Sequence, residues 1–153
     1  MAVDSWTERP VEILHVEDNL GDIKLAEIAF SGLTVPTRVS VVMDGDQALN
    51  FLKREGDYVE APRPDLILMD LNIPKLDGRE VLKEIKRDRE LRRIPVIVLT
   101  SSEAEQDINI SYDLQASCYI RKSESLEQFL EVFQNIEKFW FRTARLPGAA
   151  ELA

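Results

Sequence analysis

The sequence contains few of the residues on which whole classes of proteins depend. Among its 153 residues there is one cysteine, Cys118, and one histidine, His15. A single cysteine cannot form a disulfide within the chain, which predicts a reducing, cytoplasmic location. No apolar run approaches the ~18 residues that a transmembrane helix needs. Asp4, Glu8 and Arg9 interrupt any signal-peptide pattern near the N-terminus, so we expect neither membrane insertion nor secretion.

Positive charge is also scarce. The chain has 19 Lys and Arg residues against 28 Asp and Glu residues, which gives a formal net charge of −9 at pH 7. An acidic surface repels nucleic acid and anionic membranes, so we expect neither as a partner. Such a surface suits a cation site or a basic protein partner instead. The apolar fraction of 44% over this length is enough for one domain with a single sizeable core.

Short apolar runs alternate with helical patterns along the chain. Apolar and β-branched runs predict five strands, at 11–16, 38–42, 65–69, 95–99 and 118–120. Helical spacing of apolar residues predicts five helices, at about 23–30, 46–52, 81–91, 103–114 and 126–143. Strict alternation of strand and helix implies a parallel sheet with helices on both faces. We therefore expect an α/β fold, a flavodoxin-like doubly wound (βα)5 sheet with strand order 2-1-3-4-5.

The third predicted strand ends on a carboxylate. Four consecutive apolar residues, Leu66 to Met69, run directly into Asp70, and a proline follows at Pro74. A buried strand that ends in this way delivers its carboxylate to the rim of the sheet, where ligands bind in open α/β folds. A nucleophilic Asp70 at that rim would handle a phosphoryl group.

Other reactive side chains follow the neighbouring strands. Because the carboxyl ends of parallel strands lie at one edge, we expect five residues to converge: Glu17, Asp18, Asp70, Thr100 and Lys122. Three close carboxylates raise one another's pKa unless a cation lies among them. Hard oxygen ligands suit Mg²⁺, and a nearby lysine offers a point charge for a phosphoryl oxygen.

Four segments of the chain carry a family resemblance. They are Val16–Asn19, Met69–Pro74 with Asp77–Gly78, Leu99–Ser101, and Tyr119–Lys122. In this order and spacing they resemble the receiver domains of two-component response regulators, which have the CheY-like fold. The resemblance covers residues of about 10–140, and it divides the chain into an N-terminal extension at 1–9, a receiver domain at 10–143 and a flexible tail at 144–153.

The resemblance implies a role for each matching residue. Asp70 is similar to the phospho-acceptor that takes a phosphoryl group from a phosphohistidine of a sensor histidine kinase. Lys122 matches the lysine that contacts the phosphoryl oxygens, and Thr100 matches the hydroxyl that closes on the phosphoryl group. Tyr119 matches the aromatic residue that changes rotamer with it, although a static core aromatic is the alternative. The protein would then catalyse its own phosphorylation and dephosphorylation and would not turn over an external substrate.

The resemblance also implies a magnesium site. Glu17 and Asp18 stand where the family has its metal-binding acidic pair, Asp70 is a further ligand, and the backbone carbonyl of Asn72 completes the protein ligands. Glu17 is one methylene longer than the more common aspartate, so we expect it to reach the metal through water. Either Glu17 or Asp18 could also serve as a helix N-cap.

One position departs from the family pattern. Ser123 follows Lys122 where the family usually has proline, often after a cis peptide bond. A cis bond before a non-proline residue costs ~2.5–4 kcal/mol. Either the folded site offsets that cost, or the peptide bond is trans and the loop differs in conformation from the family's usual one. Together with a long loop from Gly56 to Pro64, this departure resembles the small response regulators that pair with bacterial, especially cyanobacterial, phytochromes. A phytochrome-type histidine kinase is therefore the expected partner.

Two other functions are weighed against the receiver. A hydrolase of the haloacid dehalogenase type needs a second aspartate two residues after its nucleophile, and here that residue is Asn72, which cannot exchange the proton. A degenerate receiver that only binds a partner is disfavoured by the intact Asp70, Thr100 and Lys122. His15 lies within a predicted strand, so we expect a hydrogen-bonded core residue rather than a phosphohistidine. Cys118 is expected to be an inert, small apolar residue.

The last helix suggests how a signal leaves the protein, since too few residues follow it for an output module. One stripe at helical spacing is expected to pack on the sheet: Leu126, Phe129, Leu130, Phe133, Ile136 and Trp140. Val132, Phe139 and Phe141 fall outside this stripe. They either pack locally under the tail or form a homodimer or partner interface on the last strand and helix. Phosphorylation would alter that interface through Thr100 and Tyr119.

Overall fold

A five-stranded parallel sheet forms the centre of the computed structural model, which describes residues 9–102 and 104–147. The strand order is β2-β1-β3-β4-β5, as predicted from the alternating pattern. The strands are β1 (Val11–Val16), β2 (Thr37–Val42), β3 (Leu66–Met69), β4 (Val96–Thr100) and β5 (Cys118–Arg121). The expected extension at 1–9 and tail at 144–153 lie largely outside the described residues.

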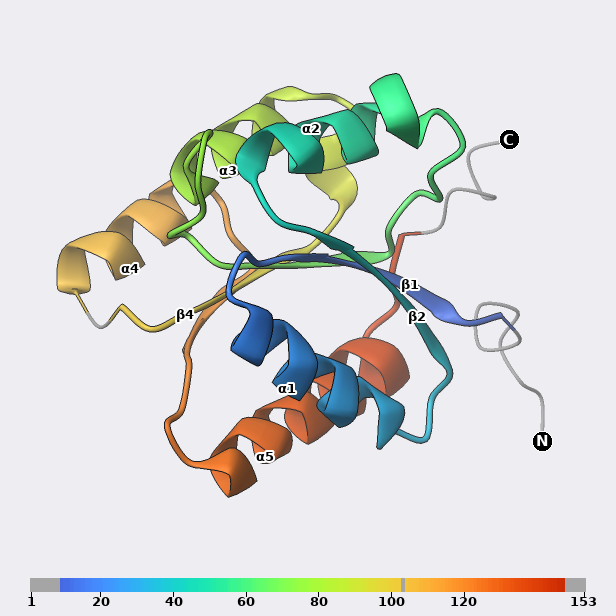
Figure 1. The fold of residues 1–153 in the computed structure, drawn as a ribbon, viewed down its shortest axis with the longest axis vertical. Coiled ribbons are helices and arrows are strands. Elements are labelled where there is room, and N and C mark those ends of the chain that lie inside the picture. The colour runs from blue at the N-terminus through green and yellow to red at the C-terminus, as the bar shows by residue number, and fades with distance from the viewer. Residues whose placement is uncertain (1–8, 103, 148–153) are drawn as a thin grey trace.

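Helices cover both faces of this sheet. They are α1 (Leu20–Ser31), α2 (Gly45–Lys53), α3 (Gly78–Arg87), α4 (Glu105–Asp113) and α5 (Leu126–Ile136). Figure 1 shows α1 and α5 on one face and α2 and α3 on the other. Three short elements complete the fold: the 3-10 helices η2 (Gly56–Tyr58) and η3 (Leu91–Arg93), and the π-helix η4 (Glu137–Thr143). The helix predicted at 81–91 is therefore shorter than expected, because Leu91 belongs to the separate turn η3.

Successive residues of each strand point to opposite faces, so the sheet separates two apolar clusters. One cluster joins β1, β3 and β4 to α2 and α3, and includes Leu14, Met69 and Leu82. The other joins the strands to α1 and α5, and includes Ile13 and Phe133. Burial on both faces explains why β3 reads as an unbroken apolar run, and it fixes the strand end that carries Asp70.

The helix caps fix where each chain segment leaves the sheet edge. Asn19 caps α1, and its side chain accepts a hydrogen bond from the backbone N–H of Asp22 at 2.9 Å. The possibility that Glu17 or Asp18 caps this helix is therefore wrong. Asp44 caps α2 and accepts from the N–H of Gln47 at 2.7 Å.

The C-terminal helix changes type partway along, which alters the predicted apolar stripe. Ile136 ends the α-helical part, and the π-helix η4 follows. A π-helix has i→i+5 hydrogen bonds, so the residue five places after Ile136 returns to the same face. That residue is Phe141, which is 1% exposed, whereas Phe139 is 53% exposed. Leu126, expected in the packed stripe, is also exposed.

The rest of the stripe packs as predicted. Phe129, Phe133 and Ile136 are buried against the sheet, and the ring of Phe133 meets Phe30 of α1 edge-on with centroids 4.9 Å apart.

None of the helices in the described part of the chain combines the length and the apolar content that a bilayer crossing requires.

Candidate functional site

Asp70 lies at the carboxyl end of β3, between the ends of β1 and β4. Its backbone N–H donates to the carbonyl of Val16 at 3.0 Å, which continues the pairing of β3 with β1. Gly78 at the start of α3 allows the chain after Asp70 to approach closely. A Cβ at Gly78 would lie 2.6 Å from Cα of Leu71 and 2.7 Å from the carbonyl oxygen of Asp70. This contact holds the loop after Asp70 against the first turn of α3.

Both carboxylate oxygens of Asp70 accept hydrogen bonds. Oδ1 accepts from the hydroxyl of Thr100 at 2.8 Å and from the backbone N–H of Asn72 at 3.0 Å. Oδ2 accepts from the ammonium of Lys122 at 2.7 Å. Asp70 is 7% exposed and Thr100 is fully buried. The structure therefore brings together the three residues that the sequence predicts as the reacting group, the hydroxyl and the cation.

The Lys122 ammonium is shared by three carboxylates. Nζ donates to Glu17 at 2.6 Å, to Asp22 at 2.8 Å and to Asp70 at 2.7 Å. Burial by itself would lower the pKa of Lys122, but the hydrogen bonds to Asp22, Asp70 and Glu17 outweigh it and raise that pKa. Lys122 is thus a permanent cation, and its backbone N–H is anchored to the carbonyl of Thr100 at 2.7 Å.

Glu17 is the most buried of these carboxylates, with 1% exposure. Burial raises its pKa, and the negative charge of Asp70 adds to that effect, while the bonds from Lys122 and from the N–H of Asn19 oppose it. When all three carboxylates are ionised, the single ammonium leaves two negative charges uncompensated. The edge of the sheet therefore carries excess negative charge at Glu17, Asp22 and Asp70.

Asp22 is a site residue that the sequence analysis missed. It lies in the first turn of α1, and its N–H is capped by Asn19. The signal was present, because a carboxylate three residues after an N-cap returns to the sheet edge that the cap faces. Asp22 lies in a helix, so the rule that strand ends meet at one edge of the sheet does not point to it.

The predicted magnesium ligands are only partly assembled. Asp18 is exposed and makes no hydrogen bond or ion pair within the described residues. In this part of the chain no three His, Cys, Asp or Glu side chains are arranged to hold a metal ion. The Lys122 ammonium takes the position among the carboxylates instead. The donor set nevertheless fits a hard divalent cation, since it offers carboxylate oxygens with uncompensated negative charge.

The predicted switch residues are joined through the loop after β4. Tyr119 is half-buried, and its hydroxyl donates to the carbonyl of Ser102 at 2.7 Å. Ser102 lies two residues beyond Thr100, the residue that contacts Asp70.

The peptide bond between Lys122 and Ser123 is trans, as are all peptide bonds of the described residues. Of the two alternatives that the sequence leaves open for this bond, cis and trans, the structure therefore has the trans form.

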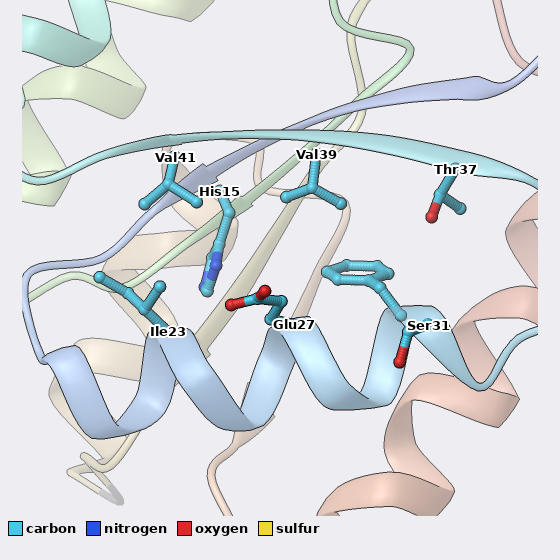
Figure 2. Close-up of a pocket in the computed structure, with 8 residues that line it drawn as sticks. His15, Ile23, Glu27, Ser31, Thr37, Val39 and Val41 are labelled. Carbon is cyan, nitrogen blue, oxygen red and sulfur yellow. The ribbon is translucent and has the colours of Figure 1, made fainter.

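His15 lines a pocket between α1 and β2 (Figure 2). The pocket has a volume of about 320 Å³, and Ile23, Glu27 and Val41 lie near the imidazole. Burial, followed by the positive charge of Lys122, lowers the pKa of His15 to about 4. The predicted core position is confirmed by 3% exposure, but the predicted hydrogen bond is absent among the described residues.

Cys118 is half-buried in β5, and burial raises the pKa of its thiol. A thiol with a raised pKa is a poor nucleophile. This agrees with the inert apolar role expected for it.

Comparison with known families gives one match over most of the chain. Residues 13–134 match the family model described as the response regulator receiver domain. Response regulator Rcp1 of Synechocystis sp. is 46% identical over 140 residues, which cover 92% of this chain and 95% of Rcp1.

Solved structures agree with this match. The crystal structure of the phosphorylated cyanobacterial phytochrome response regulator RcpA is 52% identical with a TM-score of 0.88, over 92% of this chain and all of that one. The Mn²⁺-bound form of Rcp1 is 45% identical with a TM-score of 0.86, over 91% of this chain and all of that one. The family match at residues 13–134 includes the carboxyl ends of all five strands, and so the edge that carries Asp70.

Proposed function

Because the chain belongs to the response regulator receiver domain family of two-component signalling, we propose that Asp70 accepts a phosphoryl group from a phosphohistidine of a sensor kinase. One observation carries the proposal: a buried carboxylate is held by a hydroxyl on one oxygen and an ammonium on the other. This arrangement orients a nucleophile and sets a positive charge beside the point of attack.

The proposed reaction is an in-line displacement. A carboxylate oxygen of Asp70 attacks phosphorus, the P–N bond of the phosphohistidine breaks, and the imidazole nitrogen keeps the electron pair. Lys122 lies 2.7 Å from Asp70 Oδ2, near where the equatorial oxygens of the transferred group gain charge. Thr100 would move its hydroxyl from Asp70 to the new phosphoryl oxygen, and Tyr119 would follow through the loop at Ser102.

A divalent cation is the proposed cofactor. Glu17, Asp18, Asp70 and the carbonyl of Asn72 would hold Mg²⁺, with Glu17 reaching it through water. The excess negative charge around Lys122 supports this proposal, as does the Mn²⁺-bound form of the related Rcp1. When bound, the cation would neutralise charge on the phosphoryl oxygens.

The proposed partner is a phytochrome-type histidine kinase. RcpA, at 52% identity, is a cyanobacterial phytochrome response regulator. Ser123 after Lys122, where the family usually has proline, and the long loop before β3 support the same subgroup, the response regulators that pair with phytochromes. We infer a cytoplasmic protein in which residues 10–143 form the receiver and which turns over no external substrate.

A homodimer through β5 and α5 is the proposed output. Phe139 is 53% exposed, and beside it Ile120, Val132 and Trp140 line an apolar hollow of about 480 Å³. Phe141 packs within the chain, so it does not belong to this surface. Sedimentation with and without a phosphodonor tests the dimer, and an unchanging monomer at high concentration would contradict it.

The phospho-acceptor is tested by incubation with Mg²⁺ and a small phosphodonor. The unmodified protein should gain an acid-stable, hydroxylamine-labile phosphate, and Asp70→Asn should not. Asp57→Asn, which alters an exposed carboxylate of η2, is the matched control and should be labelled normally. Equal labelling of Asp70→Asn would contradict the assignment, and absence of label from every variant would favour a receiver that only binds a partner.

A further inference from the structure

The pocket between α1 and β2 lies at the opposite edge of the sheet from β5. β2 is the last strand on this side of the sheet, and Thr37, Val39 and Val41 alternate along it on the face that α1 covers. These side chains are short, and they leave a space of about 320 Å³ beneath the helix (Figure 2).

The face of α1 that lines this pocket carries polar residues where larger apolar ones would fill it. Ile23, Glu27 and Ser31 follow one another at intervals of four residues, so they share one face of the helix. The Glu27 side chain is 68% exposed, which places its carboxylate at the mouth of the pocket. Its shown ion-pair partner is the exposed ammonium of Lys24, at 3.9 Å. Such a pair is weak, so another cation can replace Lys24.

The inner wall of the pocket holds a buried imidazole. His15 pairs with Val41 in the register of β1 and β2, and Figure 2 shows both side chains on the side that faces α1. His15 is 3% exposed, and within the described residues its side chain makes no hydrogen bond or ion pair. A buried polar group without a partner costs free energy, which a ligand that hydrogen bonds to it would recover.

We propose that this pocket binds a small organic cation that contains a flat ring system. Phe30 and Val39 supply apolar walls for the rings. A ring N–H would donate to the His15 imidazole, and the ammonium of the ligand would pair with the Glu27 carboxylate. A cation is favoured over an anion because the chain has a net charge of −9 and its one carboxylate in the pocket lies at the mouth.

The volume sets the size of the ligand. An apolar cavity of ~150 Å³ holds one benzene ring, so this pocket has room for two fused rings. It lies at the small end of the range for small-molecule sites, which begins at about 300 Å³.

Tryptamine is the probe, because it joins a two-ring system with an N–H donor to an ammonium. His15 is the only histidine of the chain, so its imidazole proton resonances report on this pocket in an NMR titration at constant pH. Tryptamine should shift them saturably, with a Kd of about 1 mM, the scale for so small a ligand. Indole-3-propionate, which has a carboxylate in place of the ammonium, should bind at least about tenfold more weakly. Methylation of the ring nitrogen of tryptamine should weaken binding about fivefold.

Variants at exposed positions test the charge without disturbing the core. Glu27→Gln should weaken the binding of tryptamine about fivefold and remove most of its preference over indole-3-propionate. Lys24→Ala, which removes the competing ammonium, should strengthen it about twofold. Glu131→Gln makes the same change of charge at an exposed glutamate of α5 and is the matched control, which should bind normally.

Three results would overturn the proposal. The first is the lack of a saturable shift at His15 at concentrations well above the expected Kd, which would mean that water alone fills the pocket. The second is equal affinity for the amine and the carboxylate. The third is a set of shifts confined to Ile120 and Trp140, which would place tryptamine in the hollow beside β5 and α5.

Phosphorylation is tested separately from this binding. Within the described part of the chain, neither His15 nor Glu27 shares a hydrogen bond or ion pair with Asp70. Glu27→Gln should therefore take label from a phosphodonor at the normal rate, whatever its effect on tryptamine.

Discussion

The Lys122 ammonium lies 2.7 Å from Oδ2 of Asp70 and occupies the space among the carboxylates where a metal ion was expected. Its other two partners are Glu17 and Asp22. A cation that is already held by the proposed ligands must be displaced, at least in part, before a divalent cation can use them. We therefore expect Lys122 both to assist the proposed phosphoryl transfer and to oppose binding of the metal.

Replacement of Lys122 by alanine should separate these two roles. Without the ammonium, the carboxylates should bind Mg²⁺ about tenfold more tightly, because a nearby unit positive charge has been removed. Phosphorylation by a small donor should slow, since the charge that faces the phosphoryl oxygens is lost. Calorimetric titration with Mg²⁺ measures the first effect and labelling rates measure the second.

Lys53→Ala, at an exposed lysine of α2, is the matched control for this comparison. Weaker binding of Mg²⁺ by Lys122→Ala than by the control would contradict the competition. In the absence of Mg²⁺, Lys122→Ala should also lower the free energy of unfolding by roughly 3 kcal/mol, because the buried carboxylates of Glu17 and Asp70 lose the ammonium that pairs with them.

The hydroxyl of Thr100 should matter more for reaction than for folding. Thr100→Val keeps the shape of the fully buried side chain but removes the donor to Asp70 Oδ1. We expect about tenfold slower phosphorylation with a loss of unfolding free energy of about 1 kcal/mol. Thr100→Ser retains the donor and should react at nearly the normal rate. Equal rates for the valine and serine variants would rule out a role for the hydroxyl.

His15 should make the fold sensitive to mild acid. Its pKa in the folded state is lowered to about 4, whereas an unperturbed histidine has a pKa of about 6.5. The unfolded chain therefore binds the proton first, and stability is lost as the pH falls from about 6.5 towards 4.

Comparison with His15→Leu isolates this effect, because the other acidic groups are common to both proteins. The free energy of unfolding of the unmodified protein should fall relative to the variant by roughly 3 kcal/mol across that range. Above pH 7 the difference between the two should be constant. Denaturant melts at several pH values provide the measurement, and parallel curves down to pH 4 would refute the assignment.

Because of the π-helix η4, we predict opposite effects on stability when Phe139 and Phe141 are replaced. Phe141→Ala removes a ring that is 1% exposed and should lower the free energy of unfolding by about 3–5 kcal/mol. Phe139→Ala removes a ring that is 53% exposed and should change it by no more than about 0.5 kcal/mol. Melts at low protein concentration keep any dimer from contributing. A continuous α-helix would give a different order of effects, with Phe139→Ala at least as costly as Phe141→Ala.

The sequence predicts the sheet and most of its edge because both follow from periodicity. Alternating apolar runs and helical patterns predict a parallel sheet, and right-handed crossovers favour the flavodoxin-like strand order that is observed. Parallel strands then bring Asp70, Thr100 and Lys122 to one edge. The contacts of Asp70 with Thr100 and Lys122 needed no information on how any helix is rotated about its axis.

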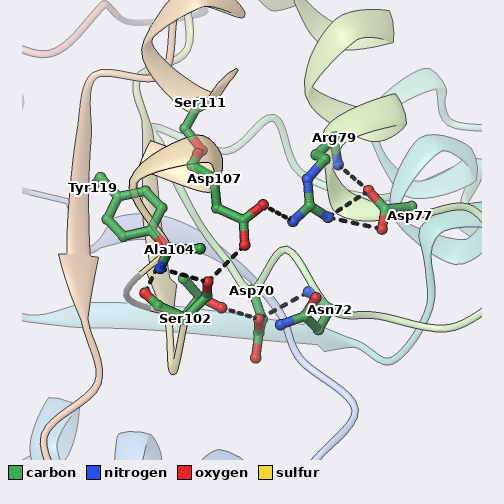
Figure 3. A network of polar contacts seen from close by, with 10 residues as sticks. Asp70, Asn72, Asp77, Arg79, Ser102, Ala104, Asp107, Ser111 and Tyr119 are labelled. Carbon is green, nitrogen blue, oxygen red and sulfur yellow. Dashed lines mark hydrogen bonds and ion pairs between the residues drawn. The ribbon is translucent and has the colours of Figure 1, made fainter. Parts of the chain in front are cut away.

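The features that were missed depend on the rotation of helices. Asp22 reaches Lys122 because Asn19, and not Asp18, caps α1, which begins at Leu20. Phe141 is buried only because one turn changes from i→i+4 to i→i+5 bonding, which apolar spacing does not reveal. Arg79 of α3 donates to Asp107 of α4 (Figure 3), and this contact requires the two helices to face each other at their first turns.

The most direct test of the central claim is to locate the phosphoryl group on the chain. The protein is phosphorylated with a histidine kinase or a small donor in the presence of Mg²⁺, reduced with borohydride to convert any acyl phosphate to an alcohol, and digested for peptide mass spectrometry. We predict that the modification lies on Asp70, in the segment Leu66–Pro74, and disappears in Asp70→Asn. Modification of Glu17, Asp22 or His15 in its place, with Asp70 untouched, would contradict it.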